Sequence, residues 1–123
     1  MDAALLRTKG AQPMNVRMAS VLGFALRIGK RATLTPAPSS RVYGMLMELT
    51  DTEIEQLYSE LSVSAYRPEA VVADLADGSR VPALCFNLPL APSPEEGNPD
   101  YAAKLRDLGR RIGLPADYVE NIH

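Results

Sequence analysis

The chain of 123 residues is long enough for one domain with a modest core and too short for two. Its hydrophobic content of 46% and charged content of 23% are ordinary for globular proteins and exclude a wholly disordered chain. The net charge is −2, and no apolar run approaches the ~20 residues that a membrane-spanning helix needs, so we expect no membrane partner.

The chain has one cysteine, Cys85, and one histidine, His123. A single thiol cannot form an internal disulfide, which favours the reducing environment of the cytosol, and we expect a cytoplasmic protein. One Cys and one His are too few for the usual zinc or soft-metal site, so we expect no bound metal.

The charge is unevenly spread along the chain. Residues 1–41 carry seven basic residues and one acid, whereas the remainder carries six basic and fourteen acidic residues. The basic part indicates either a nucleic-acid surface or a solvated face whose field attracts a small anion. Its only aromatic residue is Phe24, and single-stranded nucleic acids need several aromatic stacking platforms. We therefore expect no nucleic-acid partner.

The first elements are predicted as a short helix and two strands. Residues 2–8 fit the helix, and residues 18–28 and 31–36 fit two strands joined by a turn at Gly29-Lys30. In the second strand Thr33 alternates with apolar residues, which predicts that its hydroxyl faces water. Two prolines, at 36 and 38, are then expected to break the chain.

Residues 41–48 form the next predicted strand. Apolar residues fall on both of its faces, which predicts burial on both sides. Gly44 lies within it, and a glycine in a buried strand indicates close backbone approach, a contact with a ligand, or a bulge or bend of the sheet.

A helix comes next, and its first turn has a capping box. Thr50 caps the helix and Glu53 lies three residues on. An apolar stripe at helical spacing is expected to be buried; it consists of Ile54, Leu57, Tyr58 and Leu61.

The second half of the chain is predicted as a hairpin followed by two helices. Residues 69–76 and 80–87 are expected to pair across Asp77-Gly78, and residues 88–98 form a Pro-rich loop. The next helix runs from its cap at Asn98 to Gly113, with an apolar stripe of Tyr101, Leu105, Leu108 and Ile112. A short helix after Leu114-Pro115 is expected to bury Tyr118 and Ile122. This order predicts an α+β protein with a partly closed sheet or small mixed β-barrel flanked by helices.

Glu60 is a candidate general base near the end of its helix. A carboxylate there meets the negative end of the helix dipole, at a cost of about 0.3–1 kcal/mol. It is either an exposed surface residue or a carboxylate held in a pocket, where burial and the dipole raise its pKa. Tyr66 and Tyr101 could offer polar tips beside it, or be core tyrosines.

Four segments in order resemble the γ-glutamylcyclotransferase-like family, over residues from about 20 to the C-terminus. They are VYGMLMELTDTEIEQLY–SELSVSAY, DGSRVPALCFNLP, NPDYAAKL and GLPADYV. The resemblance implies a small mixed barrel with flanking helices. It also implies cyclisation of a γ-glutamyl small-molecule substrate to 5-oxoproline with release of an amine or amino acid, and we expect no cofactor.

The resemblance assigns roles to residues. The family's catalytic Glu falls on Glu60; an alignment shifted by one residue would place Leu61 there and imply a dead site. Tyr101 matches a substrate contact, and Phe86 replaces a pocket tyrosine, so that one hydroxyl is lost. With Tyr66 and Gly44 these residues form the predicted substrate-binding set.

The start of the chain departs from the family. Family members open with a strand ending in Tyr-Gly-Ser-Asn, whose loop amides bind the γ-glutamyl part. Met1 and its neighbours resemble the segment that comes directly after the Asn of that motif, so we expect one domain over residues 1–123 without this strand. Either the start codon is misassigned, or a short inactive protein binds a small anion or a protein. An unpaired sheet edge would favour a homodimer.

Overall fold

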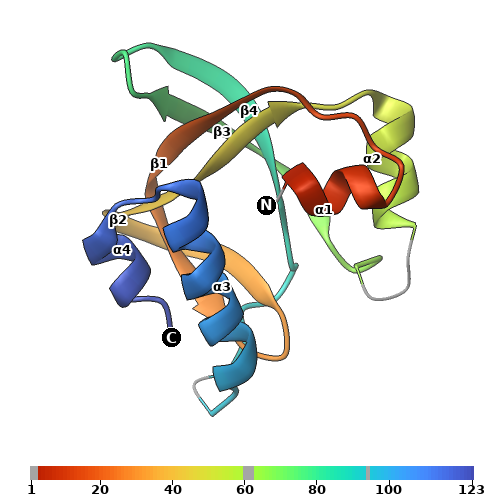
Figure 1. Ribbon diagram of the computed structural model, residues 1–123. Coiled ribbons are helices and arrows are strands. Elements are labelled where there is room, and N and C mark those ends of the chain that lie inside the picture. Colours follow the sequence, from red (N-terminus) through yellow and green to blue (C-terminus); the bar gives the residue numbers. More distant parts are fainter. Residues whose placement is uncertain (1–2, 60–62, 94) are drawn as a thin grey trace.

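The computed structural model describes residues 3–59, 63–93 and 95–123. Within these residues a four-stranded antiparallel sheet has the strand order β2-β1-β3-β4 and is flanked by helices (Figure 1). The predicted α+β class is therefore confirmed. The elements in chain order are α1 (Ala3–Thr8), β1 (Met14–Ile28), β2 (Ala32–Glu48), α2 (Asp51–Tyr58), β3 (Arg67–Leu75), β4 (Arg80–Asn87), α3 (Pro99–Ile112) and α4 (Ala116–Glu120).

The helices lie in two groups. In Figure 1, α3 and α4 lie against the β1–β2 ribbon, whereas α1 and α2 lie together beyond the opposite end of the sheet. The buried core between α3 and the ribbon contains Ile28, Ala102 and Ile122, with Leu26, Ala32, Leu105 and Tyr118 packed against it. In the part of the chain that the structure describes, no helix is long and apolar enough to cross a membrane.

The strand β2 is longer than predicted. Its 17 residues unite the two predicted strands 31–36 and 41–48, so the expected break at the prolines is wrong. Pro36 and Pro38 are tolerated because β2 is an edge strand of the described sheet and needs fewer N–H donors. Pro36 pairs with Phe24 next to a register shift, where Gly23 has a φ of 95° and absorbs the irregularity.

Burial on both sides of 41–48 is also wrong. Within 41–48, all of which the structure describes, Val42 is the only buried residue; residues 41 and 43–47 are half-buried and Glu48 is exposed. Gly44 pairs with Ala19 in unbroken register, so it forms no bulge. A Cβ at Gly44 would meet nothing within 4 Å, so no backbone approaches closely there.

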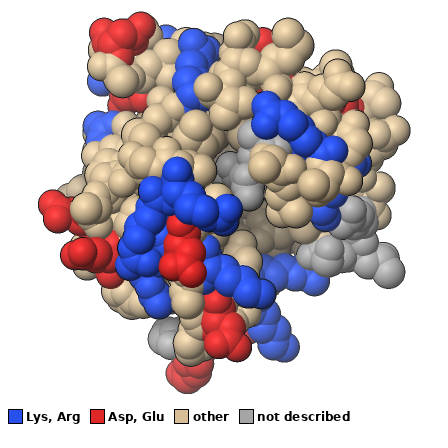
Figure 2. Space-filling model, viewed as in Figure 1, with Lys and Arg blue, Asp and Glu red and all other residues tan. Residues whose placement is uncertain are grey.

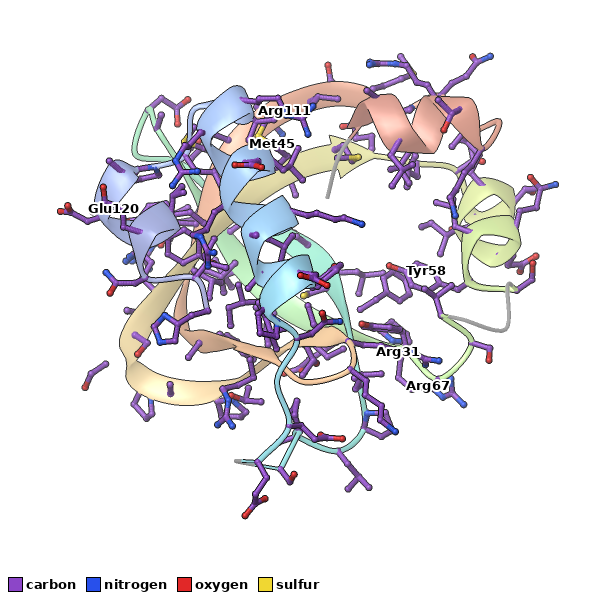
Figure 3. The ribbon with its side chains drawn as sticks, turned by 60° about the horizontal axis from the view of Figure 1, so that its bottom comes forward. Arg31, Met45, Tyr58, Arg67, Arg111 and Glu120 are labelled. Carbon is purple, nitrogen blue, oxygen red and sulfur yellow. The ribbon has the colours of Figure 1, made fainter. Side chains whose placement is uncertain are left out.

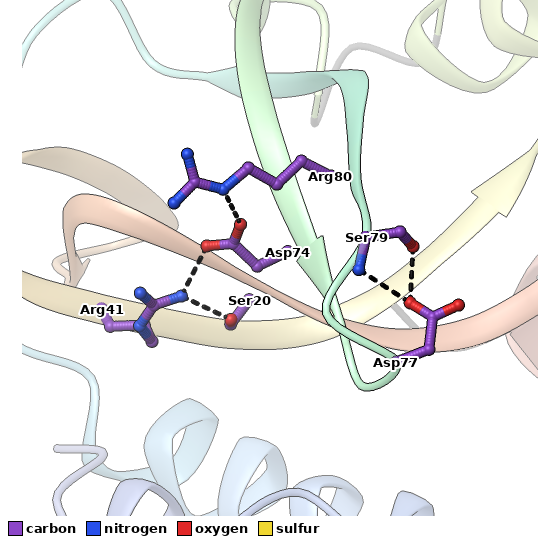
Figure 4. A network of polar contacts seen from close by, with 6 residues as sticks. All are labelled: Ser20, Arg41, Asp74, Asp77, Ser79 and Arg80. Atoms are coloured by element: carbon purple, nitrogen blue, oxygen red, sulfur yellow. Dashed lines mark hydrogen bonds and ion pairs between the residues drawn. The ribbon is translucent and has the colours of Figure 1, made fainter.

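The β3–β4 hairpin has the predicted turn. Gly78 has a φ of 87°, and the Ser79 N–H donates to the Asp77 carboxylate at 2.9 Å (Figure 4). Asp77-Gly78 was therefore a correct turn signal.

The hairpin joins the β1–β2 ribbon over a short distance. Two residue pairs, Ala19↔Leu75 and Ser20↔Asp74, connect β1 to β3; we call them the β1–β3 junction. Side chains reinforce it, as Figure 4 shows. Arg41 donates to Ser20 Oγ at 2.7 Å and to Asp74 Oδ2 at 2.8 Å, and Arg80 Nε donates to Asp74 Oδ1 at 2.9 Å. Asp74 therefore links all four described strands.

The sheet is not closed into a barrel. Among the described residues no ladder joins the outer strands β2 and β4. They meet at one end through side chains instead. Asn87 Oδ1 accepts the Leu34 N–H at 3.1 Å, and Thr33 Oγ1 accepts the Leu88 N–H at 2.9 Å. Thr33 is only 4% exposed, so its predicted contact with water is wrong: its hydroxyl faces β4.

The predicted helix ends are confirmed. Thr50 and Glu53 form both hydrogen bonds of the capping box, Asn98 caps α3, and Gly113 ends α3 in the left-handed conformation. The stripes are less buried than expected. In α2, Ile54, Leu57 and Tyr58 are half-buried, and Leu61 lies outside the described residues. The buried residues of α3 are Ala102 and Gly109.

Candidate functional site

Three aromatic side chains from separate segments meet between α2 and the sheet. The rings of Tyr58 and Phe86 stack with centroids 4.2 Å apart, and the rings of Tyr58 and Tyr66 lie 6.2 Å apart. We call these three residues the aromatic cluster. Tyr58 ends α2, Phe86 lies near the end of β4, and Tyr66 immediately precedes β3. In Figure 3, the Tyr58 side chain points from α2 into the space between α2 and α3.

The hydroxyl of Tyr66 is anchored to β2. It donates a hydrogen bond to the carbonyl of Ala32. Burial raises the pKa of Tyr66, the nearby Tyr101 raises it further, and the positive charge of Arg31 lowers it. Tyr101 belongs to α3, and Arg31 immediately precedes β2.

Burial also keeps the other phenols neutral. It raises the pKa of Tyr58 to about 12, with smaller contributions from Cys85 and Tyr66. It raises the pKa of Tyr101 as well. At neutral pH these side chains remain hydrogen-bond donors and acceptors without charge.

Asn87 fixes the end of β4 behind the cluster. Its side chain is 6% exposed. Its Nδ2 donates to Glu69 Oε1 at 3.0 Å while its Oδ1 accepts from Leu34 N. Each buried side-chain nitrogen or oxygen in the described ranges has a hydrogen-bond partner. The backbone that carries Phe86 is thereby held in place.

The surface is hollowed beside α3. Figure 2, in the orientation of Figure 1, shows a recess between the position of α3 and that of α1 and α2. A separate cavity of about 190 Å³ lies between β1–β2 and the C-terminal residues, where Arg41, Tyr118 and His123 contribute to its lining. That cavity includes none of the predicted site residues.

The predicted site residues differ in where they lie. Tyr66 and Phe86 both lie against Tyr58, and Tyr101 raises the pKa of Tyr66. Gly44 lies on the β1–β2 ladder, outside these contacts. Glu60, like Leu61, lies outside the described residues. All the assigned roles stay predictions.

Three residues of this region were not predicted from the sequence: Tyr58, Asn87 and Arg31. Tyr58 was assigned only to the apolar stripe of α2. The sequence does indicate a role for Asn87. It lies on the same face of β4 as Val81, Ala83 and Cys85, and a polar side chain is buried on such a face only when it has hydrogen-bond partners. Arg31 had no local signal. In the described ranges, no group of three or more His, Cys, Asp or Glu side chains is placed to hold a metal ion.

No protein-family model matches the chain, and no curated protein matches it. Solved structures do match. An uncharacterized protein from Homo sapiens has a TM-score of 0.76 and 18% identity over 97% of this chain and 77% of its own. A gamma-glutamyl cyclotransferase has a TM-score of 0.75 and 18% identity over 93% and 74%. A protein from Arabidopsis thaliana has a TM-score of 0.65 and 18% identity over 90% and 77%.

Proposed function

Since this chain has the fold of a γ-glutamyl cyclotransferase, we propose that it cyclises a γ-glutamyl compound to 5-oxoproline and releases an amine or amino acid. We place this reaction in the cytosol, in line with the single, half-buried thiol of Cys85. The observation that supports the proposal most is the convergence of Tyr66, Phe86 and Tyr101. They come from three separate segments. The sequence resemblance assigns Phe86 and Tyr101 to the substrate site, and Tyr66 was predicted there as a polar tip beside the carboxylate.

The proposed reaction is an intramolecular acyl transfer. The substrate's α-amine nitrogen attacks its own γ-carbonyl carbon, a C–N bond forms, and the bond from that carbon to the leaving nitrogen breaks. A free α-amine has a pKa near ~8 and is mostly protonated at neutral pH. A base must take a proton from this nitrogen and return one to the leaving nitrogen. In the proposal Glu60 does both, which contributes a factor of about 10²–10⁴ in rate.

The described side chains suit the binding of such a substrate. Because the Tyr66 hydroxyl donates its hydrogen bond to the Ala32 carbonyl, its oxygen lone pairs remain available to accept a hydrogen bond from an N–H of the α-amine. The stacked rings of Tyr58 and Phe86 offer an apolar wall for the aliphatic part of the glutamyl group.

A substitution of Glu60 tests the proposal. We expect the wild-type chain to release 5-oxoproline from at least one of a γ-glutamyl amino acid, a γ-glutamyl amine and glutathione. Glu60→Gln should lower kcat at least about 10²-fold, because the amide cannot accept the proton. Glu55→Gln is the matched control, since Glu55 is an exposed residue of α2. Full activity of Glu60→Gln would contradict the role of Glu60, and no turnover of any compound would contradict the function.

Phe86 favours a second candidate, a binding module without turnover. Phe86 lacks the hydroxyl of the tyrosine that the family has at this position, and its ring is stacked on that of Tyr58. A saturable thermal shift with a γ-glutamyl compound, without 5-oxoproline release, would support this candidate.

A further inference from the structure

We propose that the cavity between the β1–β2 ribbon and the C-terminal residues is a second ligand site, which takes a small organic carboxylate with an apolar body. Its volume is about 190 Å³. The C-terminal residues that line it belong to α4 or follow it, beside the β1–β2 ribbon (Figure 1). None of the residues predicted to bind the γ-glutamyl substrate lines this cavity, so the proposal does not depend on the cyclisation.

The walls of the cavity are held in place by contacts outside it. Ile122 is 6% exposed, and its carbonyl accepts a hydrogen bond from Arg106 Nη1 at 2.5 Å. The ring of Tyr118 packs edge-on against that of Tyr43, with centroids 5.2 Å apart. Because these walls are ordered before a ligand arrives, a ligand would lose little free energy in ordering them.

The lining of the cavity is partly apolar and partly polar. The apolar residues include Ala25, Leu26 and Ile122, and the polar residues include Ser40, Arg41 and Asn121. A cavity of comparable size, about 150 Å³, holds a benzene ring when its lining is wholly apolar. A ligand that suits the present cavity therefore combines a body of about that size with a polar group.

Arg41 favours an anionic polar group. Its Nη1 donates to Asp74 Oδ2 at 2.8 Å and to Ser20 Oγ at 2.7 Å (Figure 4). Among the residues that the structure describes, no hydrogen bond or ion pair engages its Nε or Nη2. The carboxylate of Asp74 is shared with Arg80, so a positive charge remains on the pair of arginines. Nε and Nη2 carry two parallel N–H groups, the arrangement that binds a carboxylate through two hydrogen bonds.

The position of Arg41 strengthens such a contact. Its side chain is 33% exposed, compared with 73% for Arg80, so water and salt screen its charge less. A carboxylate with an apolar body gains from both parts of the lining. A neutral amide of the same shape loses the charge-assisted hydrogen bonds, and an inorganic anion gains nothing from Leu26 and Ile122.

Benzoate and benzamide, which share a ring and differ in charge, test the proposal. Each is titrated into the isotope-labelled chain, and the backbone amide shifts give both the dissociation constant and the location of binding. Ala25→Leu fills the cavity, and Arg41→Gln removes the guanidinium. Their matched controls are Ala70→Leu, at an exposed position of β3, and Arg80→Gln, which removes the other arginine that contacts Asp74.

We expect benzoate to shift the amides of Leu26, Ser40 and Ile122. It should bind about 10- to 100-fold more tightly than benzamide, the range for a hydrogen bond to a charged group. Arg41→Gln should bring the two dissociation constants together, whereas Arg80→Gln should keep them apart.

The cavity-filling variant gives a second, independent measurement. Ala25→Leu should weaken benzoate binding about 10-fold or more, because the added side chain occupies the space of the ring. Ala70→Leu should leave it unchanged. Ala25→Leu keeps Arg41 and its contacts with Asp74, so it tests the cavity even where Arg41→Gln fails to fold.

Each part of the proposal has a result that would overturn it. Shifts confined to the aromatic cluster would place benzoate in the proposed substrate site and overturn the second site. Equal binding of the two compounds, or a preference that survives Arg41→Gln, would overturn the role of Arg41. Unchanged benzoate binding in Ala25→Leu would overturn the cavity as the location. No shift of any amide up to the solubility limit of benzoate would overturn the proposal as a whole.

Discussion

Thr33 and Asn87 hold the outer strands of the sheet together through single side chains. Thr33 Oγ1 accepts the Leu88 N–H at 2.9 Å and Asn87 Oδ1 accepts the Leu34 N–H at 3.1 Å. Both residues are more than nine-tenths buried. A donor left without its acceptor in such a place costs about 1–3 kcal/mol, because water cannot replace the lost bond.

Thr33→Val should therefore lower the free energy of unfolding by about 1–3 kcal/mol. Valine keeps the shape of threonine but leaves the Leu88 N–H without an acceptor. Urea denaturation measures the effect. The control is Thr35→Val, a half-buried threonine two residues further along the same strand. An equal loss in both variants would show that the hydrogen bond to Leu88 is not the cause.

Single residues were harder to predict from the sequence than motifs. The alternation of polar and apolar residues placed Thr33 on the other face of the strand from its apolar neighbours. It does not show which face meets water and which meets β4, and Thr33 is in fact buried. Phe86 and Tyr101 were selected by resemblance and Tyr66 by its residue type; in the structure Tyr66 and Phe86 both lie against Tyr58, and Tyr101 raises the pKa of Tyr66. The role of Asn87 depends on a contact between residues far apart in the chain, that with Leu34. No local pattern contains that information.

The contact between α3 and α4 depends on a residue without a side chain. Gly109 is buried on α3, and a Cβ placed there would lie 2.9 Å from Cγ2 of Val119 on α4. Val119 is 1% exposed and β-branched, so it has little freedom to move away. The glycine permits a closer helix–helix approach than alanine would.

Gly109→Ala should lower the free energy of unfolding by up to about 2 kcal/mol, because overpacking costs about 1–3 kcal/mol and alanine gains only ~1 kcal/mol in helix propensity. The same substitution made in a Val119→Ala background should instead stabilise the chain, since only the propensity gain remains. Thermal denaturation of the wild type, the two single variants and the double variant gives the coupling free energy between the two substitutions. Additive effects of the two substitutions would contradict this account.

At the scale of elements, local signals predicted the structure well. The capping box at Thr50, the Asp77-Gly78 turn and the cap at Asn98 each act within a few residues, and all three are present. The continuity of β2 was not predictable in this way. Whether Pro36 breaks a strand depends on whether its missing N–H faces a neighbouring strand, and that depends on its edge position in the sheet.

Asp74 connects the hairpin to the ribbon, and its ionisation affects the whole molecule. The hydrogen bond from Arg41, together with the charges of Arg80 and Arg41, holds the pKa of Asp74 below its ordinary value of 3.8. A carboxylate whose pKa is lower in the folded state stabilises that state above its ordinary pKa. This contribution is lost as the pH falls from the ordinary value through the lowered one.

Asp74→Asn should therefore be less stable than the wild type at pH 7, and the difference should shrink as the pH falls below 3.8, the ordinary pKa of the carboxyl. Urea unfolding midpoints at pH 7, 5, 4 and 3 measure this convergence. Asp107→Asn removes a carboxylate from the exposed surface of α3 and serves as the control. Parallel curves for the wild type and Asp74→Asn would contradict the role of Asp74.

At the scale of the whole molecule, the α+β class and the flanking helices were predictable from the order of elements. The closed barrel did not form in the described residues, where β2 and β4 meet only through Thr33, Asn87 and their bonds. Ring closure depends on how strands curl in space, which hydrophobic periodicity does not encode.

The shortness of the β1–β3 junction has a consequence for the order of folding. The strands of each hairpin are separated by only a few residues, so their pairing costs little chain entropy. Ala19 and Leu75, by contrast, are 56 positions apart, and the junction that they form contains one further backbone pair and the side-chain bonds of Asp74. We therefore expect the two hairpins to form first and their docking through this small contact to limit the rate of folding.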